Sequence, residues 1–388
     1  MINFTYHNPT KIIFGETQIS QLKDELKPYE NETILLVYGK QSIKKLGIYD
    51  TIIDIAKSLN ITIIEEAGVR PNPSMDSVYS GREKAIKHGC KFVLAAGGGS
   101  VIDAAKAIAF SVYLDKGEVW DVFLFEKEAK QALPLGVVLT LAATGSESNG
   151  NTVVTNDQTK EKRSVAYPFL FPQFAIIDPS YTLSVNKHYT IAGAVDIIMH
   201  VFEQYFSNTE RTETADYMST GIIKSVIDNV NRYLDGDNSY QTRANLSWAA
   251  TIGLNWILQQ GKVGDWATHR LSYPLTQVYG LTHGFALTAL FPTWLEMALL
   301  ENQKTMTKRL NFLGKEIFLT KTPKETIEAI RALFKSFGAP TTLKDAGINA
   351  SDKDLDNLAT TAVRLGPVGT VMKIDEALAK ALFRQANG

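Results

Sequence analysis

Five apolar runs recur along the first half of the chain, and helical patterns lie between several of them. A continuous run of apolar residues is typical of a strand buried on both faces of a parallel sheet. Strands that alternate with helices indicate an open, mostly parallel α/β sheet. The expected strands are 33–37, 61–64, 92–96, 135–139 and 174–177, and the expected helices between them are 49–59, 74–87 and 102–112.

After Asp178-Pro179 the pattern becomes helical, with expected helices over 186–206, 212–234, 239–258 and 324–337. A chain of 388 residues is too long for one ordinary core. We therefore expect an α/β domain over residues 1–183 and an all-α domain over residues 184–388. Near the start, Phe4-Thr5-Tyr6 and Lys11–Phe14 flank Asn8-Pro9-Thr10, which predicts a hairpin whose exposed edge would permit a homodimer.

Composition excludes several classes of partner. The chain is 45% hydrophobic and 21% charged, as soluble globular proteins are, and its net charge of −1 leaves no electrostatic footprint for nucleic acid or an anionic membrane. The single cysteine, Cys90, forbids an intramolecular disulfide and is expected to be a small buried residue rather than a nucleophile. No signal peptide opens the chain, and the apolar stretch 285–300 is too short to span a bilayer. We expect a cytoplasmic protein.

A glycine-rich segment, Gly97-Gly98-Gly99-Ser100, follows an expected strand and opens an expected helix. Glycines allow close approach to an anion and positive φ, and a helix N-terminus offers free N–H groups to a pyrophosphate. Ser100 and Asp103 also fit an N-cap and a first-turn acceptor, which would make the segment a tight turn only. The segment lacks the G-x-G-x-x-G pattern, so an ordinary dinucleotide fold does not follow.

Two further strand ends carry polar residues that suit a nucleotide. Gly39, Lys40, Gln41 and Ser42 follow the first strand without a carboxylate. A carboxylate there would bind an adenosine ribose and repel a 2′-phosphate, so its absence favours NADP over NAD. An ordinary polar loop fits equally well. The segment 140–147, Thr-Leu-Ala-Ala-Thr-Gly-Ser-Glu, is either a ligand-facing turn or a capped one.

Asp196 and His200 lie four residues apart in an apolar stretch that is predicted to be an interior helix. Residues at this spacing share one helix face, and a buried carboxylate is costly unless it is paired or binds a metal. His269 lies in an expected helix, and His283 follows fourteen residues later at a glycine-bounded turn. One Asp and three His suit Fe²⁺ or Zn²⁺. The Asp196–His200 spacing alone fits a hydrogen-bonded core pair better.

Taken together, these segments resemble the iron-containing alcohol dehydrogenase family, within it the branch of NADP-dependent butanol dehydrogenases and broad-range aldehyde reductases. The resemblance covers nearly the whole chain. Its motifs, in order, are Phe14-Gly15, Tyr38-Gly39, Ser42-Ile43-Lys44-Lys45, Pro71-Asn72-Pro73, Gly97–Ser100 with Asp103 and Lys106, Thr144–Glu147, Asp178-Pro179, Val195–His200 with Glu203-Gln204-Tyr205, and Asp265–His283. It implies a nucleotide-binding α/β domain and a helical metal-binding domain of dehydroquinate synthase-like architecture.

The resemblance also implies roles for individual residues. The metal ligands would be Asp196, His200, His269 and His283. Gly97, Gly98, Gly99 and Ser100 would hold the pyrophosphate. The segment Gly39 to Ser42 matches the NADP-preferring branch, whereas NAD-preferring members carry an aspartate. The remaining positions that would line the cofactor are Thr140, Thr144, Asn149, Lys162 and Tyr181.

One position departs from the pattern. Many relatives have a histidine four residues after the third ligand, thought to relay a proton, and Tyr273 stands there in this chain. The proton relay could run through Tyr273, a ribose hydroxyl or water. Tyr273 fits equally well as a wall of the pocket.

These observations predict hydride transfer between NADP(H) and a small aliphatic aldehyde or primary alcohol, such as butanal and butanol. The metal would polarise the substrate oxygen, and the cofactor would carry the redox chemistry. A glycerol dehydrogenase-like or sugar-phosphate enzyme on the same fold is a second hypothesis, although such enzymes usually use one Asp and two His. A metal-dependent hydrolase, with the glycine segment as a turn, is a third.

Overall fold

The computed structural model describes all 388 residues, which fall into two compact units. We call residues His7–Val185 with Ser239–Thr251 the α/β unit. The helical unit contains Met1–Tyr6, Asn186–Asn238 and Ile252–Gly388. The main boundary between the units lies after Val185, two residues beyond the expected boundary. Two short segments cross over: Met1–Tyr6 belongs to the helical unit, and Ser239–Thr251 belongs to the α/β unit.

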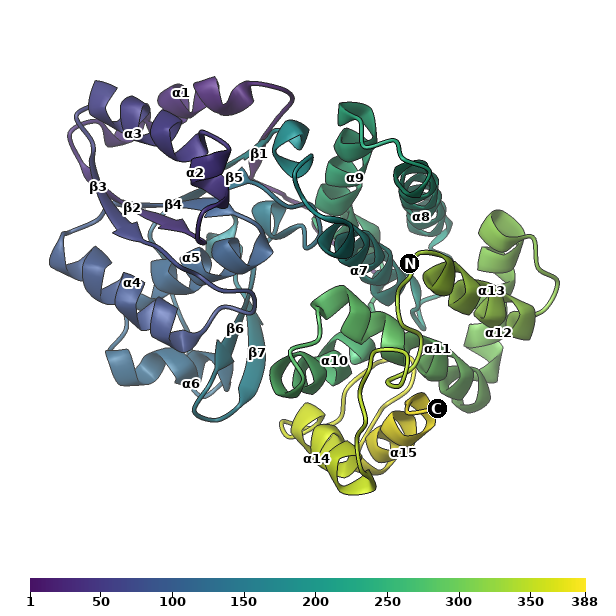
Figure 1. The fold of residues 1–388 in the computed structure, drawn as a ribbon. Helices are drawn as coiled ribbons and strands as arrows, with labels where there is room; N and C mark the ends of the chain where they lie inside the picture. The colour runs from purple at the N-terminus through teal and green to yellow at the C-terminus, as the bar shows by residue number, and fades with distance from the viewer. The chain divides into compact units, whose positions relative to one another are not determined.

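A six-stranded sheet in the order β1-β8-β5-β4-β2-β3 forms the α/β unit (Figure 1). Every neighbouring pair in it is parallel. The five predicted apolar runs are five of these strands, so the expected fold class is confirmed. The strands are β1 (Lys11–Phe14), β2 (Thr33–Tyr38), β3 (Thr62–Glu66), β4 (Phe92–Gly97), β5 (Leu135–Leu139) and β8 (Phe174–Ile177).

Both faces of the sheet carry an apolar core, because successive side chains of a strand point to opposite faces. Leu35 and Val37 of β2 belong to one cluster, and Ile34 and Leu36 belong to the other. This double burial is why the strands read as continuous apolar runs. The helices of the unit are α1 (Leu22–Leu26), α2 (Ser42–Lys45), α3 (Ile48–Ser58), α4 (Met75–Lys87), α5 (Gly99–Ser111) and α6 (Val119–Phe123), with most of α9 (Tyr240–Gly253).

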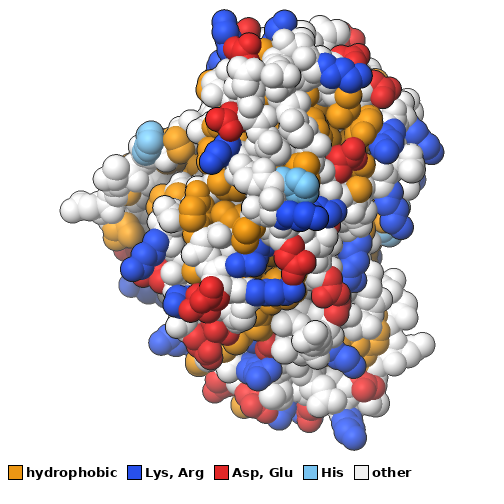
Figure 2. Space-filling view, turned by 90° about the vertical axis from the view of Figure 1, so that its left-hand side faces the viewer, with side chains coloured by type: hydrophobic (Ala, Val, Ile, Leu, Met, Phe, Trp, Pro, Cys, Tyr) orange, Lys and Arg blue, Asp and Glu red, His pale blue; other side chains and the backbone are white.

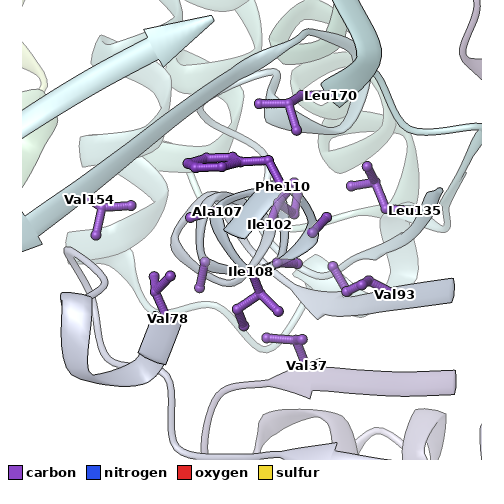
Figure 3. Close-up of a cluster of buried hydrophobic side chains, with 14 of the residues drawn as sticks. Val37, Val78, Val93, Ile102, Ala107, Ile108, Phe110, Leu135, Val154 and Leu170 are labelled. Atoms are coloured by element: carbon purple, nitrogen blue, oxygen red, sulfur yellow. The ribbon is translucent and has the colours of Figure 1, made fainter. Parts of the chain in front are cut away.

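Helix α5 lies in the middle of the first cluster, as Figure 3 shows in a view close to the helix axis. Ile102, Ile108 and Phe110 of α5 point outward into surrounding apolar side chains. Nearly every residue of α5 is buried, including four alanines that let neighbouring elements approach closely. The glycine segment at the start of α5 is therefore held on a rigid support.

Two features at this stage differ from the expectations. Residues 1–10 form no strand, so the predicted N-terminal hairpin is wrong. β1 instead pairs in parallel with β8, and Asn8 Oδ1 accepts a hydrogen bond from the Thr10 N–H (3.1 Å) in a local turn. In addition, β6 (Asn151–Asn156) and β7 (Glu161–Ala166) form an antiparallel hairpin. Its polar sequence gave no apolar run to predict it from.

The helical unit is built around α7 (Lys187–Tyr205), in which every residue from Thr190 to Tyr205 is buried. The Asn186 side chain caps it by accepting from the Tyr189 N–H (3.0 Å). Helix α11 packs against both α7 and α10. The other helices are α8 (Glu213–Leu234), α10 (Ala267–Val278), α11 (His283–Glu301), α12 (Gln303–Leu313), α13 (Pro323–Ser336), α14 (Asp352–Ala362) and α15 (Glu376–Ala386).

The surface is mixed in charge. On the face shown in Figure 2, acidic and basic side chains are interspersed, with hydrophobic side chains between them. This agrees with the net charge of −1. None of the helices combines the length and the apolar character that crossing a bilayer requires.

Candidate metal centre and nucleotide-binding loops

Asp196 and His200 lie one turn apart on α7, and both are buried. His200 Nδ1 is 3.8 Å from Asp196 Oδ1, which is too long for a hydrogen bond. His200 Nδ1 is moreover buried without a hydrogen-bond partner. Asp196 and His200 are therefore not a hydrogen-bonded core pair. A buried nitrogen that has no hydrogen-bond partner and lies close to a carboxylate is the arrangement expected of two metal ligands.

His269 of α10 completes a group of three. One ligand atom from each of Asp196, His200 and His269 lies within 4.8 Å of the others. The His200 and His269 rings are 4.7 Å apart. Ligand bonds of about 2.0–2.2 Å allow atoms at such separations to share one ion after small side-chain adjustments.

His283 is the first residue of α11 and approaches the same carboxylate. Its Nε2 lies 3.8 Å from Asp196 Oδ1, and its ring lies 5.4 Å from that of His269. The His283 side chain is 23% exposed, whereas that of Asp196 is 4% exposed. The four residues named from the sequence thus meet in one place, with His283 on the open side.

The surroundings of His200 favour its neutral imidazole. Burial lowers the pKa of His200 to about 4, and the nearby Asp196 carboxylate opposes this only in part. A neutral imidazole is the form that binds a metal ion. The four side chains offer imidazole nitrogens and one carboxylate, a donor set that fits Fe²⁺ or Zn²⁺.

Glu203 is a buried residue beside the cluster to which our reasoning from the sequence assigned no role. Its Oε1 accepts from the His269 backbone N–H (2.9 Å) and contacts His269 Nδ1 at 3.1 Å. This contact makes Nδ1 the protonated nitrogen and turns Nε2 toward the cluster. Burial raises the pKa of Glu203 to about 8. Glu203 lies seven residues after Asp196, two helical turns along the same face, and this spacing is the signal that could have revealed it.

Replacing Glu203 with alanine should lower metal affinity 10- to 100-fold, because His269 then loses the group that orients it. Glu203→Gln should have a smaller effect, since an amide oxygen still accepts from the His269 N–H groups. Competition with a fluorescent chelator measures the affinity, and thermal unfolding measures stability alongside it. Equal metal affinity in the wild type and in Glu203→Ala would show that Glu203 serves only the packing of α7.

The glycine segment joins the end of β4 to the start of α5, as expected: Gly97 is the last residue of the strand and Gly99 the first of the helix. Added Cβ atoms on Gly97 and Gly99 would lie 2.6 Å from Val101 Cγ2 and 2.4 Å from Thr144 Oγ1. Glycine is therefore required by close packing. None of the three glycines has positive φ, contrary to our expectation. The alternative cap is also wrong: the N-cap is Gly98, and the Ser100 hydroxyl instead accepts from the Asn72 N–H (3.3 Å).

The loop after β5 is organised by Lys106, which is fully buried. Lys106 Nζ donates to the backbone oxygens of Ser146 (2.6 Å), Asn149 (2.8 Å) and Asn151 (2.9 Å). Burial lowers the pKa of Lys106, and the Asp103 carboxylate opposes that shift. These bonds set the shape of the loop that carries Thr144 and Asn149.

The other predicted cofactor residues fall into two groups. Lys162 Nζ donates to Asn72 Oδ1 (2.9 Å), and so reaches the glycine segment through the Asn72–Ser100 contact. The Thr140 N–H donates to the Gly97 carbonyl (3.0 Å). Tyr181, by contrast, packs against the cluster on the other face of the sheet, where burial raises its pKa to about 12.

The segment from Gly39 to Ser42 is mostly exposed. The Gly39 carbonyl accepts from the Gly68 N–H (2.9 Å). A carboxylate does lie near the end of β2, but it comes from the neighbouring strand: Glu65 accepts from the hydroxyls of Tyr38 and Tyr49. The sequence did not reveal it, because strand pairing brings it there.

Cys90 is buried, and burial raises its pKa to about 11. It is therefore a poor nucleophile, as expected.

The fold and the donor set together define a class of chain: a parallel α/β unit with a glycine-rich strand–helix turn, and a helical unit with an Asp/His₃ cluster. The model of the iron-containing alcohol dehydrogenases matches residues 9–179, and the model of the C-terminal region of that family matches residues 190–386. The chain belongs to the iron-containing alcohol dehydrogenase family. It is an oxidoreductase of alcohols and aldehydes, and its family implies a nicotinamide cofactor and a divalent metal.

The matches to relatives and to a solved structure extend over 90% or more of the chain. It is 41% identical over 384 residues to the probable NADH-dependent butanol dehydrogenase 1 of Bacillus subtilis, covering 97% of each chain. It is 34% identical to the NADPH-dependent aldehyde reductase YqhD of Escherichia coli, covering 90% of this chain and 91% of that one. The crystal structure of NADH-dependent butanol dehydrogenase A from Thermotoga maritima superposes with a TM-score of 0.93 at 36% identity, covering 100% and 99% of the two chains.

Proposed function

We propose that the protein is an NADP(H)-dependent alcohol dehydrogenase and aldehyde reductase that acts on small aliphatic aldehydes and primary alcohols such as butanal and butanol. The observation that carries this proposal is the meeting of Asp196, His200, His269 and His283 from α7, α10 and α11. The named activities of the Bacillus and Escherichia relatives support the substrate class.

The four clustered side chains are the proposed metal ligands, for Fe²⁺ or Zn²⁺. Asp196 supplies the only negative charge among them, so the ligand set leaves a divalent ion with a net charge near +1. When bound, the ion supplies Lewis acidity toward the substrate oxygen. Glu203 holds the His269 ring through Nδ1, and His283 is the proposed ligand with the most exposed side chain.

Tyr273 is proposed as a further catalytic residue. It follows His269 by one turn of α10 and is partly exposed, with its ring 6.3 Å from that of His283. Its hydroxyl would pass a proton between the substrate and solvent. A role as a wall of the site fits the same position. A solvent isotope effect that persists unchanged in Tyr273→Phe would favour the wall.

The cofactor-binding group is proposed to be Gly39, Lys40, Gln41, Ser42, Gly97, Gly98, Gly99, Ser100, Thr140, Thr144, Asn149, Lys162 and Tyr181. The choice of NADP rests on the Gly39–Ser42 segment, which has no carboxylate of its own and includes Lys40. The relatives divide on this point, since the Bacillus protein is named NADH-dependent and the Escherichia protein NADPH-dependent.

Butanal reduction by anaerobically purified, metal-analysed protein tests the cofactor. We expect kcat/KM to be about tenfold or more higher with NADPH than with NADH, which corresponds to about 1.4 kcal/mol. Ser42→Asp should remove that preference by repelling the 2′-phosphate, whereas Ser20→Asp, at an exposed position of the same unit, should not. Faster turnover with NADH would refute the choice of NADP and leave the alcohol dehydrogenase assignment intact.

A homodimer is also proposed. β1 is an edge strand, so one side of it offers unpaired N–H and C=O groups to a second copy. Light scattering on the purified protein measures the mass directly, and a monomer at micromolar concentration would refute the proposal.

A further inference from the structure

Two tryptophans of the helical unit have left-handed backbone conformations, Trp256 at φ 73° and Trp266 at φ 63°. Bulky residues are rarely found at positive φ, and they persist there only where the surrounding structure holds them. Trp266 immediately precedes α10, the helix that carries His269.

Two neighbours hold the Trp266 indole in place. Its Nε1–H donates to Gln259 Oε1 (2.8 Å), and its ring packs against that of Trp256 at 5.6 Å. Gly264 makes room for this arrangement, because a Cβ at that position would lie 2.6 Å from Gln259 Oε1 and 2.9 Å from Trp266 Nε1. The hydrogen bond to Gln259 thus fixes the polar edge of the indole. The left-handed backbone and the contact with Trp256 fix the orientation of the ring.

The fixed indole lies against two of the proposed ligands. Its ring meets that of His269 edge-on at 5.2 Å and lies 6.4 Å from that of His200. Both histidines are buried, whereas Trp266 keeps part of its surface exposed. A rigid, partly exposed apolar surface therefore adjoins the imidazoles at which the substrate oxygen would be activated.

We propose that Trp266 forms the apolar wall along which the carbon chain of the substrate lies, so that the enzyme selects unbranched, unsubstituted alkyl chains of about four carbons over shorter or hydroxylated ones. This inference rests on the proposed function and names the part of the substrate that the site recognises. Burying one methylene group against such a surface changes kcat/KM about fourfold, so two methylenes give about fifteenfold. A hydroxyl on the chain would find no hydrogen-bond partner on this wall and is disfavoured.

The test compares kcat/KM for ethanal, butanal and 3-hydroxybutanal in the wild type, Trp266→Ala and Trp266→Phe, each with its metal content measured. We expect Trp266→Ala to lower the ratio of kcat/KM for butanal to that for ethanal about tenfold. The ratio of kcat/KM for butanal to that for 3-hydroxybutanal should also fall. Trp266→Phe keeps a flat apolar ring and should restore both ratios. Trp248→Ala, which removes an exposed tryptophan from α9, is the matched control and should leave both ratios unchanged.

The outcomes separate the wall from other roles of Trp266. If Trp266→Ala lowers the three rates by one common factor, or only reduces metal content, Trp266 merely positions the imidazoles and the inference fails. Unchanged rates and ratios also overturn it. If Trp266→Ala is unstable, the same ratios are read from Trp266→Leu, whose smaller side chain should still reduce them. A metal-loaded wild type that reduces none of the three aldehydes refutes the proposed function itself.

Discussion

Asp196→Ala should reduce kcat/KM for butanal by roughly three orders of magnitude, which corresponds to a loss of ~4 kcal/mol of transition-state stabilisation. Asp196 is the only carboxylate in the cluster, and its Oδ1 lies 3.8 Å from both His200 Nδ1 and His283 Nε2. Without it, three neutral imidazoles would face an ion whose charge is uncompensated. Both metal retention and activity should therefore fall.

Elemental analysis, steady-state kinetics and thermal unfolding of the same preparations check this prediction. Asp228→Ala is the matched control, because Asp228 is an exposed aspartate on α8. It should retain wild-type metal content and rate. An Asp196→Ala protein that is less stable but turns over at the full rate would remove Asp196 from the catalytic machinery.

The second large effect concerns stability. Asp216 of α8 accepts from Lys262 Nζ (2.9 Å), Arg309 Nη1 (2.6 Å) and the Thr212 hydroxyl (2.9 Å). Lys262 is fully buried at its side chain, and burial lowers its pKa to about 8. Both cations also lie over the Tyr205 ring, at 5.6 and 5.2 Å. One carboxylate thus balances two buried cations.

Asp216→Ala should lower the free energy of unfolding by about 3–5 kcal/mol, because it leaves two buried cations without a counter-charge. Urea unfolding measures the change. The control is Glu210→Ala, which removes a surface pair with Lys308 (2.7 Å) whose side chains are both more than half exposed. That variant should unfold like the wild type, since exposed pairs contribute little. A loss in Asp216→Ala no larger than in the control would show that the Tyr205 ring, together with the Ser207 and Thr209 carbonyls that accept from Arg309, suffices for the cations.

The fold could be predicted where the signal was local. Burial on both sheet faces produced the five apolar runs, and these identified five of the six parallel strands. The β6–β7 hairpin escaped prediction because its strands are polar and one, Glu161–Ala166, begins with three charged residues. The N-terminal hairpin was wrongly predicted, because alternation over a few residues does not specify the partner strand.

The candidate site was predictable to a similar extent. Asp196 and His200 share a face of one helix, and their spacing follows from the helical repeat. The helical spacing from Asp196 to Glu203 was a signal that we did not use. The contact of Trp266 with His269 and that of Lys162 with Asn72 had no local signal in the sequence. Each of these contacts depends on which residue of a distant segment packs against the side chain.

The amino-acid sequence by itself determined the parallel α/β half, the helical half and the buried face that presents Asp196 and His200, because periodicity and burial are properties of short segments. The resemblance of its motifs also named His269 and His283 as ligands. The tertiary structure alone decided how closely these two approach Asp196 and His200, and that Glu203 lies against His269. It also brought Glu65 to the end of β2 and set the indole of Trp266 against the cluster. The physical reason is that these contacts join residues far apart in the chain, and only the packing of α7, α10 and α11, or the pairing of strands, sets the distances between them.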